Sequence, residues 1–271
     1  MSTPECFDVL NIIEKNENVD MIQSLLGADC LGTYFINGDA KLYFNDGKKK
    51  DIEILLQEIC ADFPFHWNWE KQKKEDWHLA WKDNFKPVVI DEKLAVIPNW
   101  QDDYQTDIVI KIKPGMAFGT GHHETTWLML SQMMKHIKPG MSVLDLGTGS
   151  GILSIAAIKL GAGKVDAVEN DKECGTNFCE NLHLNNIKDQ IQFHHEDVLN
   201  WSCFSFDLIL VNINRNVIEE LLPKLNSTNG KVILSGLLKT DFNSIKNICN
   251  NFGLKVAGTS AKGEWISLIL S

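Results

Sequence analysis

The residues whose types and spacing best support chemistry lie in the stretch 143–151, which reads Val-Leu-Asp-Leu-Gly-Thr-Gly-Ser-Gly. An apolar run containing one acidic residue leads into three glycines at alternate positions, and a second apolar run follows at 152–158. This order predicts a strand, a tight turn and a helix. Glycines allow a sharp turn and let a ligand approach the main chain beside the positive end of the helix. The stretch therefore predicts a nucleotide-binding turn.

The glycine spacing distinguishes between classes of nucleotide. A dinucleotide-binding turn carries Gly-x-Gly-x-x-Gly, whereas here the third glycine comes one residue early and Ile152 takes its expected place. Asp145, two positions before Gly147, and Glu169, at the end of the next predicted strand, favour S-adenosylmethionine, with Glu169 holding the ribose hydroxyls. A glycine-rich turn is a weak signal by itself, so the spacing alone leaves other nucleotides open.

Polar residues also follow other predicted strands at this edge. Asn212 ends the strand that begins at 206, and its amide can accept a hydrogen bond from an amine; the alternative is a turn residue before the next helix. Asp197 follows the strand near 191–195, where an adenine would lie, and the alternative is a solvated acidic residue. We expect Asn212 to act in the site and leave both readings of Asp197 open.

A glycine-punctuated stretch, 113–126, leads into an apolar helix predicted from Thr125 to His136. Loops of this kind often carry function, and Thr126 can donate and accept at a helix start. The alternative is that Thr125 or Thr126 only caps the helix. We expect no metal site, because His122 and His123 are adjacent and no carboxylate or cysteine completes a ligand set.

Strands and helices alternate with short connections from residue 142 to 251, which predicts a parallel, doubly wound α/β sheet with ligands at the carboxyl ends of its strands. The apolar runs at 254–257 and 265–270 leave no room for a helix between them, so they must pair antiparallel. A parallel sheet closed by an antiparallel hairpin is the methyltransferase variant of this Rossmann-like fold. The predicted strands lie near 143–146, 164–169, 191–195, 206–213 and 231–235, and the helices near 151–160, 171–184, 215–225 and 240–251.

Residues 1–70 have a pattern of their own, in the order β-α-β-β-α-β of a ferredoxin-like α+β domain. Nothing there indicates catalysis, so we expect a substrate-recognition domain, with a structural appendage as the alternative. Residues 71–100 are rich in charge and tryptophan, which predicts a linker helix followed by connecting strands. The methyltransferase domain is then 101–271. Helices are expected at 18–26 and 51–60 of the first domain.

The composition and net charge of the chain favour some classes of binding partner over others. The 271-residue chain has a formal net charge of −10 and a pI near 5.3, which argues against nucleic-acid binding through phosphates and favours either a basic partner or simple solubility. The chain shows neither a membrane-spanning apolar run nor a signal peptide, so we expect a cytoplasmic protein that does not bind membranes. Its seven cysteines form no Cys-x-x-Cys pair and predict reduced thiols.

In combination, these motifs closely resemble the ribosomal protein L-eleven methyltransferase family over nearly the whole chain. The resemblance rests on 114–121, 123–126, 144–153 and 212–213, with further matches at Trp77, Trp81, Pro87, Ser235, Gly236, Gly263, Glu264 and Trp265. It implies a class I methyltransferase that methylates lysine side chains, the N-terminal α-amine, or both, on a large-subunit ribosomal protein. We expect a monomer with S-adenosylmethionine as cofactor.

Carried over by position, the resemblance implies cofactor contacts from Thr126, Gly147, Glu169 and Asn212, and Asn212 is also the expected catalytic residue. We expect Asp145, Gly149 and Asp197, at the same predicted edge, to bind the cofactor as well. The chain departs from the family in three places. The family commonly has Asp at Glu169, Thr-His-Pro at 122–124 and Asn-Ile-Leu-Ala at 212–215. Glutamate keeps the ribose contact with one more methylene, whereas the other two departures alter the edge that faces the substrate.

The cofactor limits what the enzyme must do. Its sulfonium already activates the methyl group, so the enzyme must mainly align a neutral amine. We hypothesise that Asn212 and backbone carbonyls of 115–121 orient the amine while water takes the proton. The alternatives are a methyltransferase acting on a small molecule, a nucleic acid or another protein, and a non-catalytic S-adenosylmethionine-binding protein.

Overall fold

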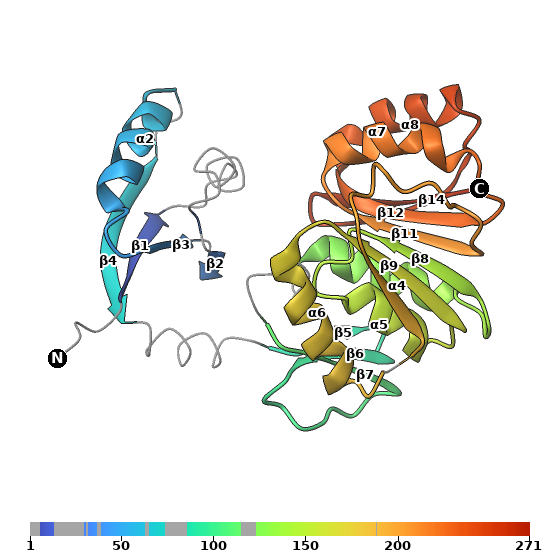
Figure 1. Ribbon diagram of the computed structural model, residues 1–271. Coiled ribbons are helices and arrows are strands. Elements are labelled where there is room, and N and C mark those ends of the chain that lie inside the picture. Colours follow the sequence, from blue (N-terminus) through green and yellow to red (C-terminus); the bar gives the residue numbers. More distant parts are fainter. Residues whose placement is uncertain are drawn as a thin grey trace. The chain divides into compact units, whose positions relative to one another are not determined.

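The computed structural model describes residues 6–13, 30, 32–36, 39–62, 65–73, 86–114, 123–187 and 189–271. The chain divides into two compact units, Met1–Lys86 and Pro87–Ser271, which are coloured along the chain in Figure 1. The sequence analysis placed a linker at 71–100. In the structure, a strand of the first unit continues past residue 70, and two strands of the second unit begin before residue 100. Trp77 and Trp81 lie outside the described residues.

The first unit contains a four-stranded sheet whose neighbouring strands all run antiparallel, in the order β2-β3-β1-β4. This is the strand order of the predicted ferredoxin-like plan; the helix expected at 18–26 lies outside the described residues. Helix α2 packs Ile52 and Leu56 against Leu10 and Phe44 of the sheet. The elements are β1 (Cys6–Ile13), β2 (Gly32–Ile36), β3 (Asp39–Asn45), α2 (Lys49–Asp62) and β4 (His66–Lys73).

The second unit is built on a seven-stranded sheet in the order β10-β9-β8-β11-β12-β14-β13. Strand β14 runs antiparallel to both of its neighbours, and the other pairs are parallel. The expected parallel sheet with an antiparallel closing hairpin is therefore confirmed. The strands are β8 (Ser142–Leu146), β9 (Lys164–Glu169), β10 (Ile191–His195), β11 (Leu208–Asn212), β12 (Lys231–Leu238), β13 (Val256–Lys262) and β14 (Trp265–Leu270).

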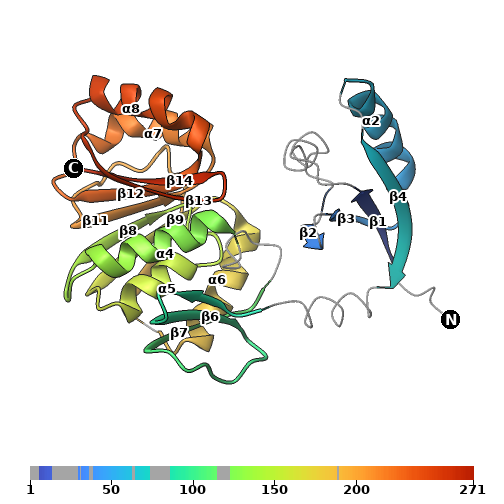
Figure 2. The ribbon, with the colours of Figure 1, turned by 180° about the vertical axis from the view of Figure 1, so that it is seen from behind.

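Helices cover both faces of this sheet because successive residues of its buried strands point to opposite sides. Val143 of β8 belongs to an apolar cluster with α4, α5 and α6, whereas Leu144 belongs to a cluster with α7 and α8. Figures 1 and 2 show α7 and α8 on one side of the strands and α4 and α5 on the other. The helices are α4 (Glu124–His136), α5 (Ile152–Lys159), α6 (Lys172–Leu184), α7 (Arg215–Leu225) and α8 (Phe242–Asn251).

A separate three-stranded sheet packs against α5 and α6. It consists of β5 (Val88–Ile90), β6 (Leu94–Pro98) and β7 (Ile108–Ile112), with β5 antiparallel and β7 parallel to β6. The sequence predicts these strands but not their pairing. Since β7 lies at the edge of this sheet, the backbone groups on its outer side have no partner among the strands that the structure describes. Within the described parts of the chain, no helix is long and apolar enough to cross a membrane.

Candidate functional site

The glycine turn between β8 and α5 has the backbone conformation that its sequence predicts. Gly147, Gly149 and Gly151 have φ values of 75°, 52° and 82°, which side chains other than glycine rarely adopt. A Cβ atom at Gly147 would lie 2.3 Å from Cγ2 of Ile213, and one at Gly151 would lie 2.6 Å from the Phe178 ring. Ile213 and Phe178 therefore pack directly against the turn, and a side chain at Gly147 or Gly151 would displace them.

Asp145 lies below this turn and is fully buried. Its Oδ2 accepts hydrogen bonds from Thr148 Oγ1 at 2.7 Å and Ser154 Oγ at 2.6 Å. Burial raises the pKa of the Asp145 carboxyl to about 6, although these two hydrogen bonds oppose the shift. Its Oδ1 is buried without a hydrogen-bond partner among the described residues. Asp145 thus ties the strand, the turn and helix α5 together.

Glu169, at the end of β9, reaches the glycine turn directly. Its Oε2 accepts the Gly149 N–H at 3.0 Å, and its Oε1 accepts the N–H groups of Asn170 and Asp171, each at 3.0 Å. A carboxylate offers about four acceptor positions, so capacity for a ribose hydroxyl remains after these three bonds.

Asn212 lies at the carboxyl end of β11, opposite Ser235 of β12. Its Oδ1 is buried and has no hydrogen-bond partner in the described part of the chain. The next residue, Ile213, is held by close approaches on two sides: its side chain lies over Gly147, and its carbonyl oxygen lies 1.9 Å from where a Cβ of Gly236 would be. These glycines let the end of β11 pass beside the glycine turn.

Thr126 lies in the first turn of α4 and is fully buried, and its Oγ1 also has no hydrogen-bond partner among the described residues. The cap of α4 is His123, whose Nδ1 accepts the Thr125 N–H at 3.3 Å. The ring of His123 packs edge-on against Trp265 with centroids 4.6 Å apart. The start of α4 is thus capped by His123 and not by Thr126, so the Thr126 hydroxyl stays available. Trp265 of the closing hairpin packs against this cap.

Asp197 was also expected in the site, and Asn214 and Arg215 are positions where the chain departs from the family. All three make structural contacts. Asp197 Oδ1 accepts the Leu199 N–H at 2.8 Å, a turn contact that does not involve the glycine turn. Asn214 caps α7 by accepting the Val217 N–H at 3.1 Å. Arg215 forms ion pairs with Glu219 and Asp241, both at 2.7 Å. The departures at 214 and 215 are therefore accounted for by capping and ion pairing around α7.

Three orphaned polar atoms gather on the elements around the glycine turn: Thr126 Oγ1, Asp145 Oδ1 and Asn212 Oδ1. Most buried polar atoms in proteins have a hydrogen-bond partner, so orphaned atoms at one edge indicate a polar ligand there. Among the described residues, the other such atoms belong to Asp8, Asn11 and Ser267. Two of these atoms are acceptors and the Thr126 hydroxyl can donate or accept, a set that fits a cofactor with hydroxyl and ammonium groups such as S-adenosylmethionine.

The described residues contain no group of three or more His, Cys, Asp or Glu side chains that could hold a metal ion. His122 lies outside these residues, and His123 is engaged as the helix cap.

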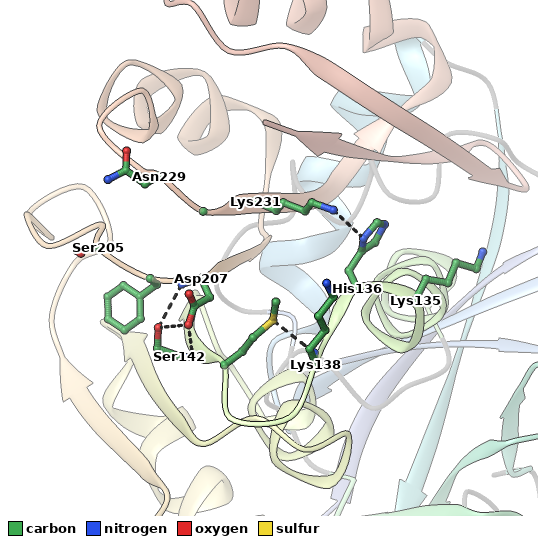
Figure 3. A pocket seen from close by; sticks show the side chains of 11 residues that line it. Lys135, His136, Lys138, Ser142, Ser205, Asp207, Asn229 and Lys231 are labelled. Atoms are coloured by element: carbon green, nitrogen blue, oxygen red, sulfur yellow. Dashed lines mark hydrogen bonds between the residues drawn. The ribbon is translucent and has the colours of Figure 1, made fainter.

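A cavity of about 550 Å³ lies at the opposite, amino edge of the same sheet. Figure 3 shows Ser142, Asp207, His136 and Lys231 around it. Two pairs of its polar groups lie within hydrogen-bonding distance: Asp207 Oδ2 accepts the Ser142 N–H and Oγ–H, each at 2.8 Å, and Lys231 Nζ lies 3.5 Å from His136 Nδ1. Burial, then Lys231 and Lys135, lower the pKa of His136.

Sequence reasoning missed several residues that build the site. Ser154, which bonds to Asp145, and His123, which caps α4, were not assigned these roles. It also missed Asn181 of α6, which is fully buried and bonds to the glycine turn. The one signal for Asn181 is the four-residue spacing of asparagines at 177, 181 and 185, which places their side chains on one helix face.

A family model described as Ribosomal protein L11 methyltransferase (PrmA) matches residues 13–271. A protein of that name from Desulforamulus reducens is 35% identical over 239 residues, covering 84% of this chain and 78% of that protein. Another from Desulforapulum autotrophicum is 38% identical over 239 residues, covering 84% and 75%. The crystal structure of ribosomal protein L11 methylase from Lactobacillus delbrueckii subsp. bulgaricus is similar with a TM-score of 0.65 and 33% identity, covering 69% of this chain and 98% of that one.

Proposed function

Because this chain belongs to the ribosomal protein L11 methyltransferase family, we propose that it methylates amines of ribosomal protein L11, on lysine side chains, the N-terminal α-amine, or both. It is an S-adenosylmethionine-dependent methyltransferase. One observation carries the location of its site: the unpaired, buried polar atoms of Thr126 and Asn212 belong to elements that meet at the glycine turn. No other region that the structure describes combines such atoms with a nucleotide-binding turn.

We assign the cofactor to the carboxyl edge of the sheet. Gly147 and Gly149 let a ligand approach the backbone, Glu169 has acceptor capacity for a ribose hydroxyl, and Thr126 offers a free hydroxyl. Asp145 supports the turn through Oδ2, which is bonded to Thr148 and Ser154, while its Oδ1 has no hydrogen-bond partner among the described residues. When bound, S-adenosylmethionine supplies a methyl group that its sulfonium has already activated.

The chain's remaining task is to present a neutral amine. Asn212 Oδ1 is a buried acceptor without a partner in the described part of the chain, and it can accept an N–H of the incoming amine while the nitrogen lone pair points toward the methyl group. An amide does not take up a proton at neutral pH, so the proton leaves to water. An α-amine, with a pKa of about 7.7 to 8.0, is more easily neutral at pH 7 than a lysine at about 10.4.

The first unit, Met1–Lys86, is proposed to recognise the protein substrate. Its sheet has the ferredoxin-like order, and among its described residues we identify no set of groups suited to methyl transfer. The net charge of −10 favours association with a basic protein. This assignment separates substrate selection from chemistry along the chain.

The proposal is tested by incubating purified ribosomal protein L11 with the full chain and S-adenosylmethionine and measuring the intact mass of L11. We expect mass increases of whole methyl groups, located by peptide mapping to lysines or the N-terminus. An unchanged L11 mass with active, cofactor-binding protein would refute the substrate assignment.

A truncated chain, Pro87–Ser271, provides the comparison for the first unit. It should still bind S-adenosylmethionine but methylate L11 far more slowly than the full chain. Equal rates of L11 methylation by both forms would show that the first unit does not select the substrate.

A further inference from the structure

Helix α6 and the residue just after its end carry three asparagines, at 177, 181 and 185, whose side chains bond to backbone groups of β7 and of Lys113, the residue that follows it. Asn181 Oδ1 accepts the Lys113 N–H at 2.7 Å, and Asn177 Nδ2 donates to the Lys113 carbonyl at 3.0 Å. Asn185 bonds both backbone groups of Lys111, accepting its N–H at 3.0 Å and donating to its carbonyl at 2.6 Å. Side-chain amides thus replace the strand that β7 lacks on this side.

The spacing of the two elements explains this pairing. Residues four apart on a helix are separated by about 6 Å along its axis, and residues two apart on a strand by about 6.6 Å. Asn181 and Asn185 are therefore in register with Lys113 and Lys111. A helix can bond to alternate residues of a strand edge in this way without distorting either element.

Asn185 Nδ2 donates to the Lys111 and Asn181 carbonyls, whereas Asn181 reaches the glycine turn. Its Nδ2 also donates to the Ser150 carbonyl at 2.8 Å, inside the glycine turn. Ser150 is 1% exposed and Asn181 is fully buried, so water cannot replace this bond. Helix α6 makes a second contact with the glycine turn, because the Phe178 ring lies against Gly151.

Asn181 therefore connects two segments that the proposed reaction depends on. One is the glycine turn that we assign to the cofactor. The other is the backbone at Lys113, which directly precedes the glycine-punctuated stretch beginning at Pro114. We propose that Asn181 is a positioning residue for methyl transfer, setting the exit of β7 relative to the glycine turn through one buried amide.

This inference rests on the proposed function, and its test uses Asn185 as a matched control. Asn181→Ala and Asn185→Ala each remove buried amide bonds to β7, so both should lower the melting temperature. Only Asn181→Ala also removes the bond to Ser150. We expect it to weaken binding of S-adenosylhomocysteine, measured by calorimetry, about tenfold or more, because errors of about 1 Å in a site can cost on the order of 100-fold in rate.

Asn181→Asp and Asn185→Asp form a second pair that keeps side-chain size. Asn181→Asp retains an oxygen for the Lys113 N–H but has no N–H group for the Ser150 carbonyl. It should lose cofactor affinity and turnover at saturating cofactor, whereas both Asn185 variants should stay within about twofold of the unmodified chain. If an alanine variant does not fold, the comparison of Asn181→Asp with Asn185→Asp tests the inference instead.

Hydrogen exchange separates this inference from the proposed function. Asn181 variants should speed exchange both at Lys113 and across 147–151, and Asn185 variants only near Lys111. Equal cofactor affinity and equal exchange of the glycine turn in the Asn181 and Asn185 variants would overturn the inference. Coupled exchange in a chain that transfers no methyl group would instead overturn the proposed function and leave the coupling standing.

Discussion

The carboxyl ends of the parallel strands form one edge of the seven-stranded sheet and their amino ends form the other. The polar groups at these two edges differ in burial and hydrogen bonding. At the carboxyl edge, Thr126 Oγ1 and Asn212 Oδ1 are buried without partners in the described structure. At the amino edge, the polar residues around the cavity of about 550 Å³ are exposed or half-buried, and Asp207 bonds to Ser142. The cavity therefore lies at the edge where water can reach the polar groups.

This difference shows which property marks a binding site in this fold. An exposed polar group must give up bonds to water when it binds a ligand, whereas a buried unpaired atom has already lost its hydration and gains a hydrogen bond when a ligand arrives. Parallel sheets of this class bind ligands at the carboxyl ends of their strands. Both the unpaired buried atoms and the topology of the sheet indicate a binding site at the carboxyl edge, whereas the cavity lies at the amino edge.

The largest expected effect comes from removing the Asn212 amide. Asn212→Ala should lower the rate of methyl transfer to L11 by about 100- to 1000-fold, because an oriented polar group in a dry site contributes on that scale. Asn229→Ala, at the amino edge, should leave the rate unchanged. Single-turnover measurements at saturating cofactor test both, and equal rates for the two variants would remove the functional distinction between the edges.

A next, smaller effect is expected from closing the glycine turn. Gly147→Ala places a Cβ atom 2.3 Å from Ile213 Cγ2 at a φ of 75°, and we expect about 100-fold weaker cofactor binding from the combined strain and overpacking. Gly140→Ala is the matched control, because its φ is 83° and a Cβ there would meet nothing within 4 Å. Similar losses of affinity in both variants would mean that backbone strain, not the turn's position, is responsible.

The smallest effect concerns stability and has opposite signs at two aspartates. Burial raises the pKa of Asp145 from 3.8 to about 6, so the folded chain holds this proton more tightly than the unfolded chain. The free energy of unfolding should therefore fall as pH rises from about 4 to about 6, by about 1.4 kcal/mol per pH unit at most. Asp145→Asn should remove this slope in denaturant titrations.

Asp207 supplies the contrast for that experiment. Hydrogen bonds from the backbone and side chain of Ser142 lower the pKa of Asp207. Its contribution to stability is present above the unfolded pKa and is lost as pH falls, so Asp207→Asn should flatten the curve only on the acid side, below about pH 4. If Asp145→Asn left the slope between pH 4 and 6 in place, Asp145 would not be its source.

The periodic parts of the second unit were predictable from sequence. Alternating apolar runs and turn glycines predicted the parallel sheet, and the short connection between 257 and 265 predicted the antiparallel closure, which the pairing of β13 with β14 confirms. In the first unit, the strand order β2-β3-β1-β4 also agrees with the pattern. These features depend on local periodicity and loop length, which a sequence contains directly.

The contacts that set the site depended on distant pairs and were not predictable in this way. The bond from Asn181 to Lys113 spans 68 residues, and no local pattern indicates which backbone group an amide will find. Glu169 was expected at the ribose, but its bond to the Gly149 N–H was not predicted. Asp145 was expected to contact the cofactor, and the bonds that its Oδ2 accepts from Thr148 and Ser154 were not predicted either.

The most direct test of this account is a crystal structure of the full chain with S-adenosylhomocysteine. We expect the ligand over the glycine turn at 147–151, with hydrogen bonds to Thr126 Oγ1, Glu169 and Asn212 Oδ1. Density for the ligand in the amino-edge cavity beside Ser142 and Lys231, or a ligand at the turn that leaves Thr126 and Asn212 unpaired, would contradict the account.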